Sequence, residues 1–228
     1  MSKGAIIHEN KHFVTIVTWK TSNIKTGQMS QIWILNKSIN PVESVKTGFD
    51  AVSNCTGCPF ANGQGCYVNV GQAPLAVFRA WQRGVYERLG ISELSEAFKG
   101  KFVRFGAYGN PSLIPLEIIK PIAKACKGWT GYFHNWHLMS RERALAYGQF
   151  FMASTETEES RIKALAMGLR VFHVSPNQPK DFIECPSDSK GIQCKDCRLC
   201  DGLNKRAKNI WINPHGAKKN KAIAQAIA

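Results

Sequence analysis

Cysteine is the residue type in this sequence most able to do chemistry, and the chain holds eight of them in 228 residues. Seven fall into two groups. The first cysteine group comprises Cys55, Cys58 and Cys66, and the second cysteine group comprises Cys185, Cys194, Cys197 and Cys200. Cys126 stands alone near the end of an apolar helical stretch, where we expect a small core residue.

The spacing of the second cysteine group predicts a metal centre. Cys194, Cys197 and Cys200 are separated by two residues each, which brings three thiolates around one compact object, as in the cysteine runs of bacterial ferredoxins. Cys185 can supply a fourth thiolate, although its Cys-Pro pair precedes the triple, whereas the ferredoxin pair comes last. Zinc is the alternative, but its sites usually combine two Cys-x-x-Cys pairs separated by a longer loop. The pattern favours a [4Fe–4S] cluster over zinc.

The first cysteine group supplies only three thiolates, from a glycine-rich loop. Three protein ligands leave one coordination position of a metal centre open to a small-molecule ligand, which chemistry needs and a purely structural site avoids. The alternative is a closed site whose fourth ligand comes from elsewhere in the chain, such as His12, His134 or Cys126. The sequence leaves both arrangements open.

The compartment and the charge also limit the function. No apolar segment follows the first residues, so no secretory signal is visible, and we expect reduced thiols in a cytoplasm rather than disulfides. No apolar run is long enough to cross a membrane. The net charge of +14 favours polyanionic partners. Basic residues at 205–221 predict a loosely ordered tail that either contacts nucleic acid or is simply solvated.

Short apolar runs alternate with amphipathic segments along most of the chain. The predicted strands are 12–19, 32–35, 102–107, 130–134, 150–153, 169–174, 182–183 and 210–212, and the predicted helices are 74–89, 115–126, 138–147 and 157–167. This alternation predicts an α/β fold with a parallel sheet, which we interpret as a partial (β/α) barrel rather than a doubly wound sheet. Residues 1–200 would form one iron–sulfur domain that includes the cluster loops 55–66 and 185–200. A closing strand and the basic tail would occupy 201–228.

The carboxyl ends of the strands form the reactive face of a barrel. Many polar or metal-ligating residues fall at these ends. They are Cys55, Cys58, Cys66, Tyr108, Asn110, His134, Asn135, Ser154, Glu156, His173, Ser175, Cys185 and His215. Loops are polar in any protein, so about half of the members other than cysteine are expected to be ordinary strand-end residues.

Four runs of the sequence together resemble an uncharacterised family of tailed-phage proteins, the gene product eighty-eight type. They are Cys55 to Tyr67, Val103 to Pro111, Met152 to Glu156, and Cys185 to Cys200. The resemblance extends over nearly the whole chain. It implies a phage origin and a place in the bacterial host cytoplasm, but no activity.

A more distant resemblance is to the partial barrel of radical S-adenosylmethionine enzymes, in which three cysteines of an early loop hold a [4Fe–4S] cluster that chelates the methionyl group. It implies that Cys55, Cys58 and Cys66 are cluster ligands. It also implies cofactor contacts from Tyr67, Gly106, Asn110, Ser154 and Glu156. The intervals between the three cysteines are two and seven residues here, whereas the usual intervals are three and two.

The sequence therefore predicts an iron–sulfur protein with one or two [4Fe–4S] clusters, one of them with an open coordination site. We interpret it as a redox or radical-type enzyme whose open cluster binds a small molecule, with S-adenosylmethionine as the candidate cofactor. One alternative is a nucleic-acid-associated protein whose clusters are structural and whose charge provides the binding. Another is an electron carrier, although the chain is far longer than a ferredoxin needs.

Overall fold

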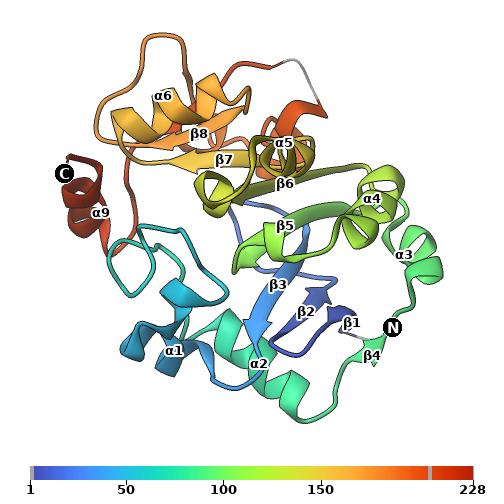
Figure 1. The fold of residues 1–228 in the computed structure, drawn as a ribbon. Coiled ribbons are helices and arrows are strands. Elements are labelled where there is room, and N and C mark those ends of the chain that lie inside the picture. The colour runs from blue at the N-terminus through green and yellow to red at the C-terminus, as the bar shows by residue number, and fades with distance from the viewer. Residues whose placement is uncertain (1–2, 205–206, 228) are drawn as a thin grey trace.

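The computed structural model describes residues 3–204 and 207–227. In this part of the chain a single 10-stranded sheet runs in the order β4-β1-β2-β3-β5-β6-β7-β8-β10-β9 (Figure 1). The first strands are β1 (Gly4–Glu9), β2 (Phe13–Thr18), β3 (Ser30–Asn36) and β4 (Glu87–Arg88), and the later ones are β5 (Phe102–Tyr108), β6 (Gly128–Phe133), β7 (Met152–Thr155), β8 (Val171–Val174), β9 (Ile183–Glu184) and β10 (Ile210–Ile212).

The later strands confirm the predicted α/β architecture. From β3 onward every neighbouring pair is parallel. β4 pairs with β1 at the far edge of the sheet. The strands β3, β5, β6, β7 and β8 lie side by side in chain order, so each new strand is added on the same side of the previous one. A doubly wound sheet reverses direction at a switch point, whereas a barrel winds one way. The topology is therefore consistent with a partial barrel.

The helices of the parallel half cover one face of the sheet. In chain order the α-helices are α1 (Pro41–Thr47), α2 (Ala73–Gln82), α3 (Ile91–Phe98), α4 (Leu116–Ala125), α5 (Arg141–Gly148), α6 (Glu158–Ala166), α7 (Pro186–Ser189), α8 (Cys194–Cys197) and α9 (Lys219–Ile227), and short 3-10 turns occupy Phe49–Val52, Pro111–Leu113, Asn135–Leu138 and Gly202–Asn204. Apolar residues of α3 to α6 pack with Val103, Phe105 and Val171 in the main core.

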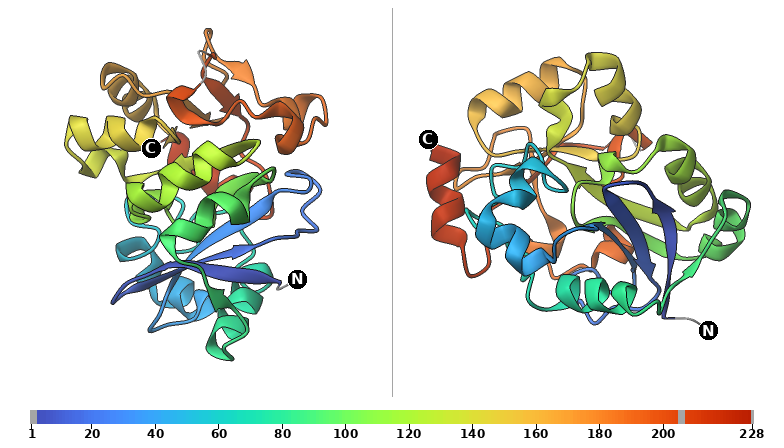
Figure 2. Two further views of the ribbon diagram at one scale, coloured as in Figure 1. Left: turned by 90° about the vertical axis from the view of Figure 1, so that its right-hand side faces the viewer. Right: turned by 60° about the horizontal axis from the view of Figure 1, so that its bottom comes forward.

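The opposite face of the parallel strands carries a second apolar cluster. Side chains alternate along a strand, so Met152 faces away from its neighbour Ala153, which joins the main core. Met152, Ile210 and Ile212 pack there with Cys185 and Cys200 of the second cysteine group. Figure 2 (left) shows this arrangement, with the yellow α5 and α6 on one side of the sheet and the orange-red segment that holds the second group on the other.

The N-terminal part differs from the prediction of an all-parallel sheet. β1, β2 and β3 pair antiparallel, and β1 was not predicted. β1 and β2 are consecutive and joined by a turn of only a few residues, too short for the crossover that parallel pairing needs. The helix predicted over 74–89 ends at Gln82, and Gly84, with φ +70°, reverses the chain just beyond it.

The C-terminal part also differs from the prediction of a loosely ordered tail. Residues Lys219–Ile227 form α9, and Ala222 on this helix is buried. Lys205 and Arg206 of the predicted tail lie outside the described residues. Cys126 packs partly buried against the main core, as expected. Among the described residues, no helix combines the length and the apolar character that crossing a membrane requires.

Candidate metal and ligand site

Both cysteine groups border one cavity of about 180 Å³ on the face of the sheet opposite the helices. Cys55, Cys58 and Cys66 line it from one side, and Cys185 and Cys194 line it from the second group. The two groups are more than a hundred residues apart in sequence, so the fold alone brings them together. This convergence is the main finding about the site.

Backbone hydrogen bonds between two segments hold the first cysteine group in place. The amide of Asn110 donates to the carbonyl of Asn54 at 2.7 Å, and its side-chain Nδ2 donates to the carbonyl of Thr56 at 3.2 Å. Gly57 approaches the end of β6 so closely that a Cβ there would lie 2.8 Å from the Cα of Asn135. The cysteine loop is thus fixed against the ends of β5 and β6. It follows α1 and a 3-10 turn rather than coming directly after a strand.

The thiols of the first group are costly to ionise without a cation. Burial raises the pKa of Cys55 well above its usual value, and the charges of Cys58 and Cys66 raise it further. Burial likewise raises the pKa of Cys66 to about 11. Metal binding reverses this preference, because a coordinated thiol is deprotonated outright. The mutual influence of the three sulfurs also shows that they lie within electrostatic range of one another.

His134 is the closest of the three candidates for a fourth ligand. Its Nδ1 lies 3.4 Å from Oε1 of Glu156, and its ring lies close enough to Cys58 for the two groups to interact electrostatically. Burial alone would lower its pKa, but Cys58 and Glu156 outweigh burial and raise it well above the usual value. Cys126 is at the end of α4, and His12 is exposed in the turn between β1 and β2.

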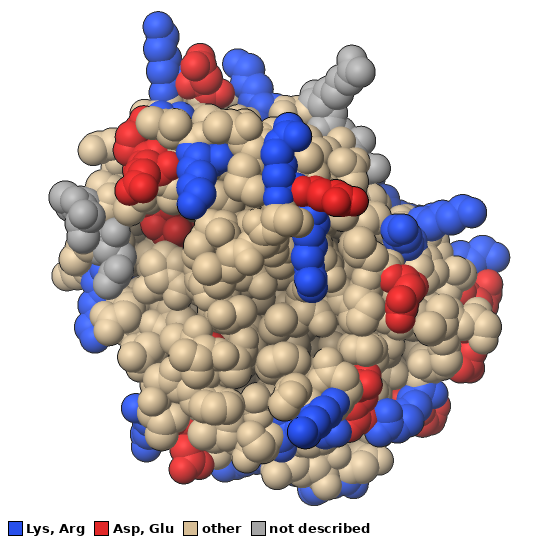
Figure 3. All heavy atoms as spheres, viewed as in Figure 1, with Lys and Arg blue, Asp and Glu red and all other residues tan. Residues whose placement is uncertain are grey.

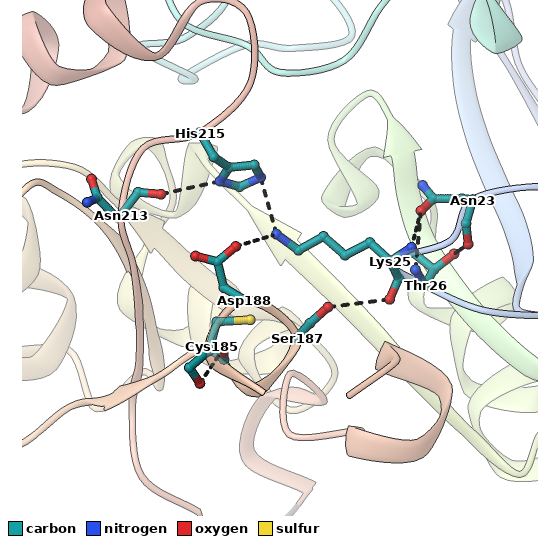
Figure 4. A network of polar contacts seen from close by, with 9 residues as sticks. Asn23, Lys25, Thr26, Cys185, Ser187, Asp188, Asn213 and His215 are labelled. Atoms are coloured by element: carbon teal, nitrogen blue, oxygen red, sulfur yellow. Dashed lines mark hydrogen bonds and ion pairs between the residues drawn. The ribbon is translucent and has the colours of Figure 1, made fainter. Parts of the chain in front are cut away.

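A loop between β2 and β3 anchors the second cysteine group. The amide of Cys194 donates to the carbonyl of Lys25 at 3.1 Å, and the amide of Lys195 donates to that of Thr26 at 3.1 Å. The Lys25 ammonium reaches across to Asp188 Oδ1 at 3.3 Å and to His215 Nε2 at 3.4 Å (Figure 4). Lys25 and His215 both line the cavity, so this network forms part of its wall.

Arg170, directly before β8, holds the C-terminal end of the second cysteine group in place. The buried Arg170 guanidinium pairs with Asp201 at 3.3 Å and donates to the carbonyls of Leu199 and Gly202. Cys200 is 7% exposed. Burial raises the pKa of its thiol, a hydrogen bond with Tyr132 lowers this pKa, and the charge of Cys185 raises it. Cys185, Cys194 and Cys197 all influence the Cys200 thiol electrostatically, and Cys185 and Cys200 pack together against β7 and β10.

The cysteines are free thiols, the residue type that iron–sulfur clusters use as ligands. No disulfide joins the eight cysteines, all of which lie among the described residues. In residues 3–204 and 207–227, no three Cys, His, Asp or Glu side chains are close enough together to hold one metal ion. Thiolates on the corners of a cubane stand further apart than thiolates on one ion. In the second cysteine group Cys185 and Cys200 are buried, and the other cysteines of both groups are partly exposed.

Arg104 brings a buried positive charge to this cavity. It is 7% exposed, donates to the Tyr67 hydroxyl at 2.7 Å, and stacks over the Tyr132 ring at 5.2 Å. The ion pairs among the described residues do not include it. Buried charges are normally paired. An anion in the cavity, whether a thiolate-ligated cluster or a bound ligand, would compensate this one.

The structure brings most of the predicted cofactor contacts to the cavity. Tyr67, Gly106, Asn110 and Ser154 line it. Glu156 does not; its Oε1 accepts from Ser154 Oγ at 3.0 Å and faces His134, an arrangement like the carboxylate partners that orient histidines beside metals. Asn110 is also committed to the cysteine loop, so its amide group positions the loop.

Sequence reasoning missed Arg104, Tyr132 and Lys25. The sequence does contain a signal for Arg104 and Tyr132. Each is next to a core residue in its strand, and because successive side chains of a strand point to opposite faces, each is expected on the face opposite the core. Lys25 had no such signal, because it is one of many lysines in polar loops.

Comparison of the chain with protein-family models, with curated proteins and with solved structures found no match.

Proposed function

We propose that this is an iron–sulfur protein with two [4Fe–4S] clusters, acting as a redox or radical-type enzyme. Cys55, Cys58 and Cys66 would hold the first cluster, and the second cysteine group would hold the other with four thiolates. The observation that supports this most is the cavity that both groups border. The phage relationship and the host cytoplasm inferred from the sequence belong to the same proposal.

Each part of the cavity has a defined role in this proposal. A [4Fe–4S] cluster transfers single electrons, and an iron without a protein ligand binds an exogenous donor. Arg104 would attract and orient an anionic group, since its guanidinium has no acidic partner among the described residues. Ser154 offers a hydroxyl, and the apolar walls exclude water. S-adenosylmethionine, which carries a carboxylate and an amine, is the candidate ligand.

Metal analysis after anaerobic purification tests the first step. We expect a brown protein with about eight iron atoms per chain and visible absorption that dithionite bleaches. Cys58→Ser and Cys197→Ser should each remove about half of the iron, while Cys126→Ser, the matched control outside both groups, should retain all of it. A colourless protein with stoichiometric zinc would overturn the proposal.

Ligand titration separates the kinds of chemistry. S-adenosylmethionine or cyanide added to the reduced protein should change the electron paramagnetic resonance signal of one cluster only, and Cys58→Ser should abolish that response. Radical chemistry further requires release of methionine and 5′-deoxyadenosine with dithionite as the electron donor. If the spectrum changes but these products do not form, the first cluster has an open coordination site and the protein is not a radical enzyme.

A further inference from the structure

A second cavity, much larger than the first, lies between the sheet and α2. This groove has a volume of about 1200 Å³ and is bordered by residues of β2, β3, α2 and β5. Pockets for small molecules usually measure about 300–1,000 Å³. The groove is therefore large enough for an extended ligand.

The charges that line the groove are all positive. Lys3, Lys20, Lys101 and Arg104 border it, whereas no Asp or Glu among the described residues does. The helix-covered side of the molecule differs: Figure 3 shows acidic and basic side chains mixed along the rim and few charges at the centre. A concave surface with one sign of charge concentrates ligands of the opposite sign. The groove thus suits a polyanion.

Aromatic rings interleave with these charges. Trp19, Trp33, Tyr67 and Tyr86 border the groove, and Tyr67 is 54% exposed while Trp19 and Tyr86 are half-buried. Basic side chains that follow a phosphate backbone, together with aromatic rings that stack on bases, are the features by which proteins hold single-stranded nucleic acid. A duplex keeps its bases stacked inside, so rings in a groove favour single strands.

We propose that this groove binds a single-stranded nucleic acid. Lys3 and Lys20, both exposed at its rim, contact phosphates, and the rings of Trp19, Tyr67 and Tyr86 contact bases, whereas Trp33 is 8% exposed and forms the floor of the groove. Lys3 and Lys20 lie outside both cysteine groups, so their phosphate contacts do not require the clusters. Tyr67 and Arg104 line both the groove and the smaller cavity, so a bound strand passes the mouth of the smaller cavity. Only a functional role for that contact rests on the proposed enzymatic function.

Fluorescence anisotropy with labelled oligonucleotides of about 12 nucleotides tests the proposal on the anaerobically purified full chain, with iron content measured in parallel. We expect tighter binding of the single strand than of the matching duplex. The double variant K3E/K20E should weaken binding roughly tenfold or more and reduce the slope of log affinity against log salt by about one to two. Iron content should be unchanged.

The matched control is K120E/K124E, which makes the same charge change at two exposed positions of α4 on the helix-covered side. Its affinity should stay within about twofold of that of the wild-type protein, since Lys120 and Lys124 do not line the groove. Equal weakening by both double variants would overturn the proposal, as would equal affinity for duplex. A mononucleotide that competes as well as the oligonucleotide would also overturn it. If the wild-type protein contains no iron but still binds the single-stranded oligonucleotide, the proposed clusters are wrong and the proposed groove is not affected.

Discussion

Arg104 is the residue whose environment demands the most explanation. A buried guanidinium costs free energy unless an opposite charge compensates it. Arg170, the other arginine buried in the parallel half, has Asp201 for this purpose. Arg104 has two tyrosines and the nearby thiol of Cys194 instead. A thiolate-ligated cluster carries net negative charge, so the proposed second cluster would supply what the side chains do not.

Arg104→Met tests this assignment. Reduction adds a negative charge to a cluster, and removing a nearby positive charge makes that addition less favourable. We expect the reduction potential of one cluster to become more negative by an amount on the order of 1 kcal/mol, or about 40 mV. Redox titration followed by electron paramagnetic resonance measures it. Arg79→Met on the exposed side of α2 should leave both potentials unchanged, and an unchanged potential in Arg104→Met would contradict the assignment.

His134 distinguishes an open first cluster from a closed one. Its contacts with Cys58 and Glu156 are those of a residue that positions a thiolate. His134→Ala should therefore keep about eight iron atoms, whereas Cys58→Ser should keep about four. Iron and sulfide assays of the anaerobic protein decide between the two. If His134→Ala loses as much iron as Cys58→Ser, His134 is a ligand and the cluster is closed.

His173 provides a pH dependence away from the clusters. Its pKa is lowered from 6.5 to about 4, mainly by burial and also by the charge of Arg161, while Glu156 and Glu158 partly oppose this. The ring faces Thr155 Oγ1 at 2.9 Å and the edge of Phe182. The unfolded chain therefore binds a proton more readily than the folded one.

The stabilisation from neutral His173 is complete above about pH 6.5 and is lost as the pH falls toward 4, by up to about 3 kcal/mol. Denaturant unfolding between these pH values should show this loss for the wild-type protein. His173→Gln, which cannot titrate, should reduce the slope over the same range. An identical slope in both proteins would assign the pH dependence to other groups.

At the scale of the elements, two short connections position both cysteine groups. The turn after β5 fixes the first group through Asn110, and the loop between β2 and β3 fixes the second through its carbonyls. The Lys25–Asp188 pair is about one third exposed on each side and contributes little by itself. Backbone hydrogen bonds therefore determine where the thiols stand, and the site depends on the backbone geometry of these connections.

Gly109 in the turn after β5 makes this dependence testable. It has φ +84°, and a methyl group there would collide with the carbonyl oxygen of Ile34. Gly84 has φ +70° with nothing within 4 Å of an added methyl group, so Gly84→Ala costs only the backbone strain of about 1–2 kcal/mol. Gly109→Ala should cost more than about 3 kcal/mol and lower the iron content. Equal unfolding free energies for the two variants would contradict the steric argument.

The elements that the sequence predicted best are those with a strong local signal. Strand and helix alternation from residue 102 onward was visible because each element has its own periodicity, and the cysteine groups were visible from spacing. β1, α1 and α3 were missed; each has only six to eight residues, although Ile91, Leu94 and Phe98 of α3 do lie at helical spacing. The convergence of Cys55 with Cys185 around one cavity could not be predicted, because it depends on the order and curvature of the whole sheet. The groove was missed for the same reason.

At the scale of the whole molecule, the C-terminal segment packs against the loop that holds the first cysteine group. α9 lies beside the loop of the first cysteine group (Figures 1 and 2). Ala222 is 3% exposed there, and a Cβ on Gly65 would lie 2.9 Å from its Cα. His215 stacks on Tyr67 at 5.4 Å. The C-terminal segment thus covers the first group from solvent, which differs from a tail that only carries charge.

Truncation after Gly216 tests whether α9 protects the first cysteine group from solvent or only contributes positive charge. Without α9 the first cluster should be exposed to water and oxygen, so its visible absorption should bleach several-fold faster in air. The measurement is made in the Cys197→Ser background, where the first cluster is the one that remains. K219A/K221A removes two exposed charges of α9 while keeping the helix, and should bleach at the parental rate. The affinity for single-stranded oligonucleotides should fall far less in the truncated protein than in K3E/K20E, because the groove lies elsewhere. Faster bleaching in K219A/K221A, or an unchanged rate after truncation, would show that α9 does not protect the site.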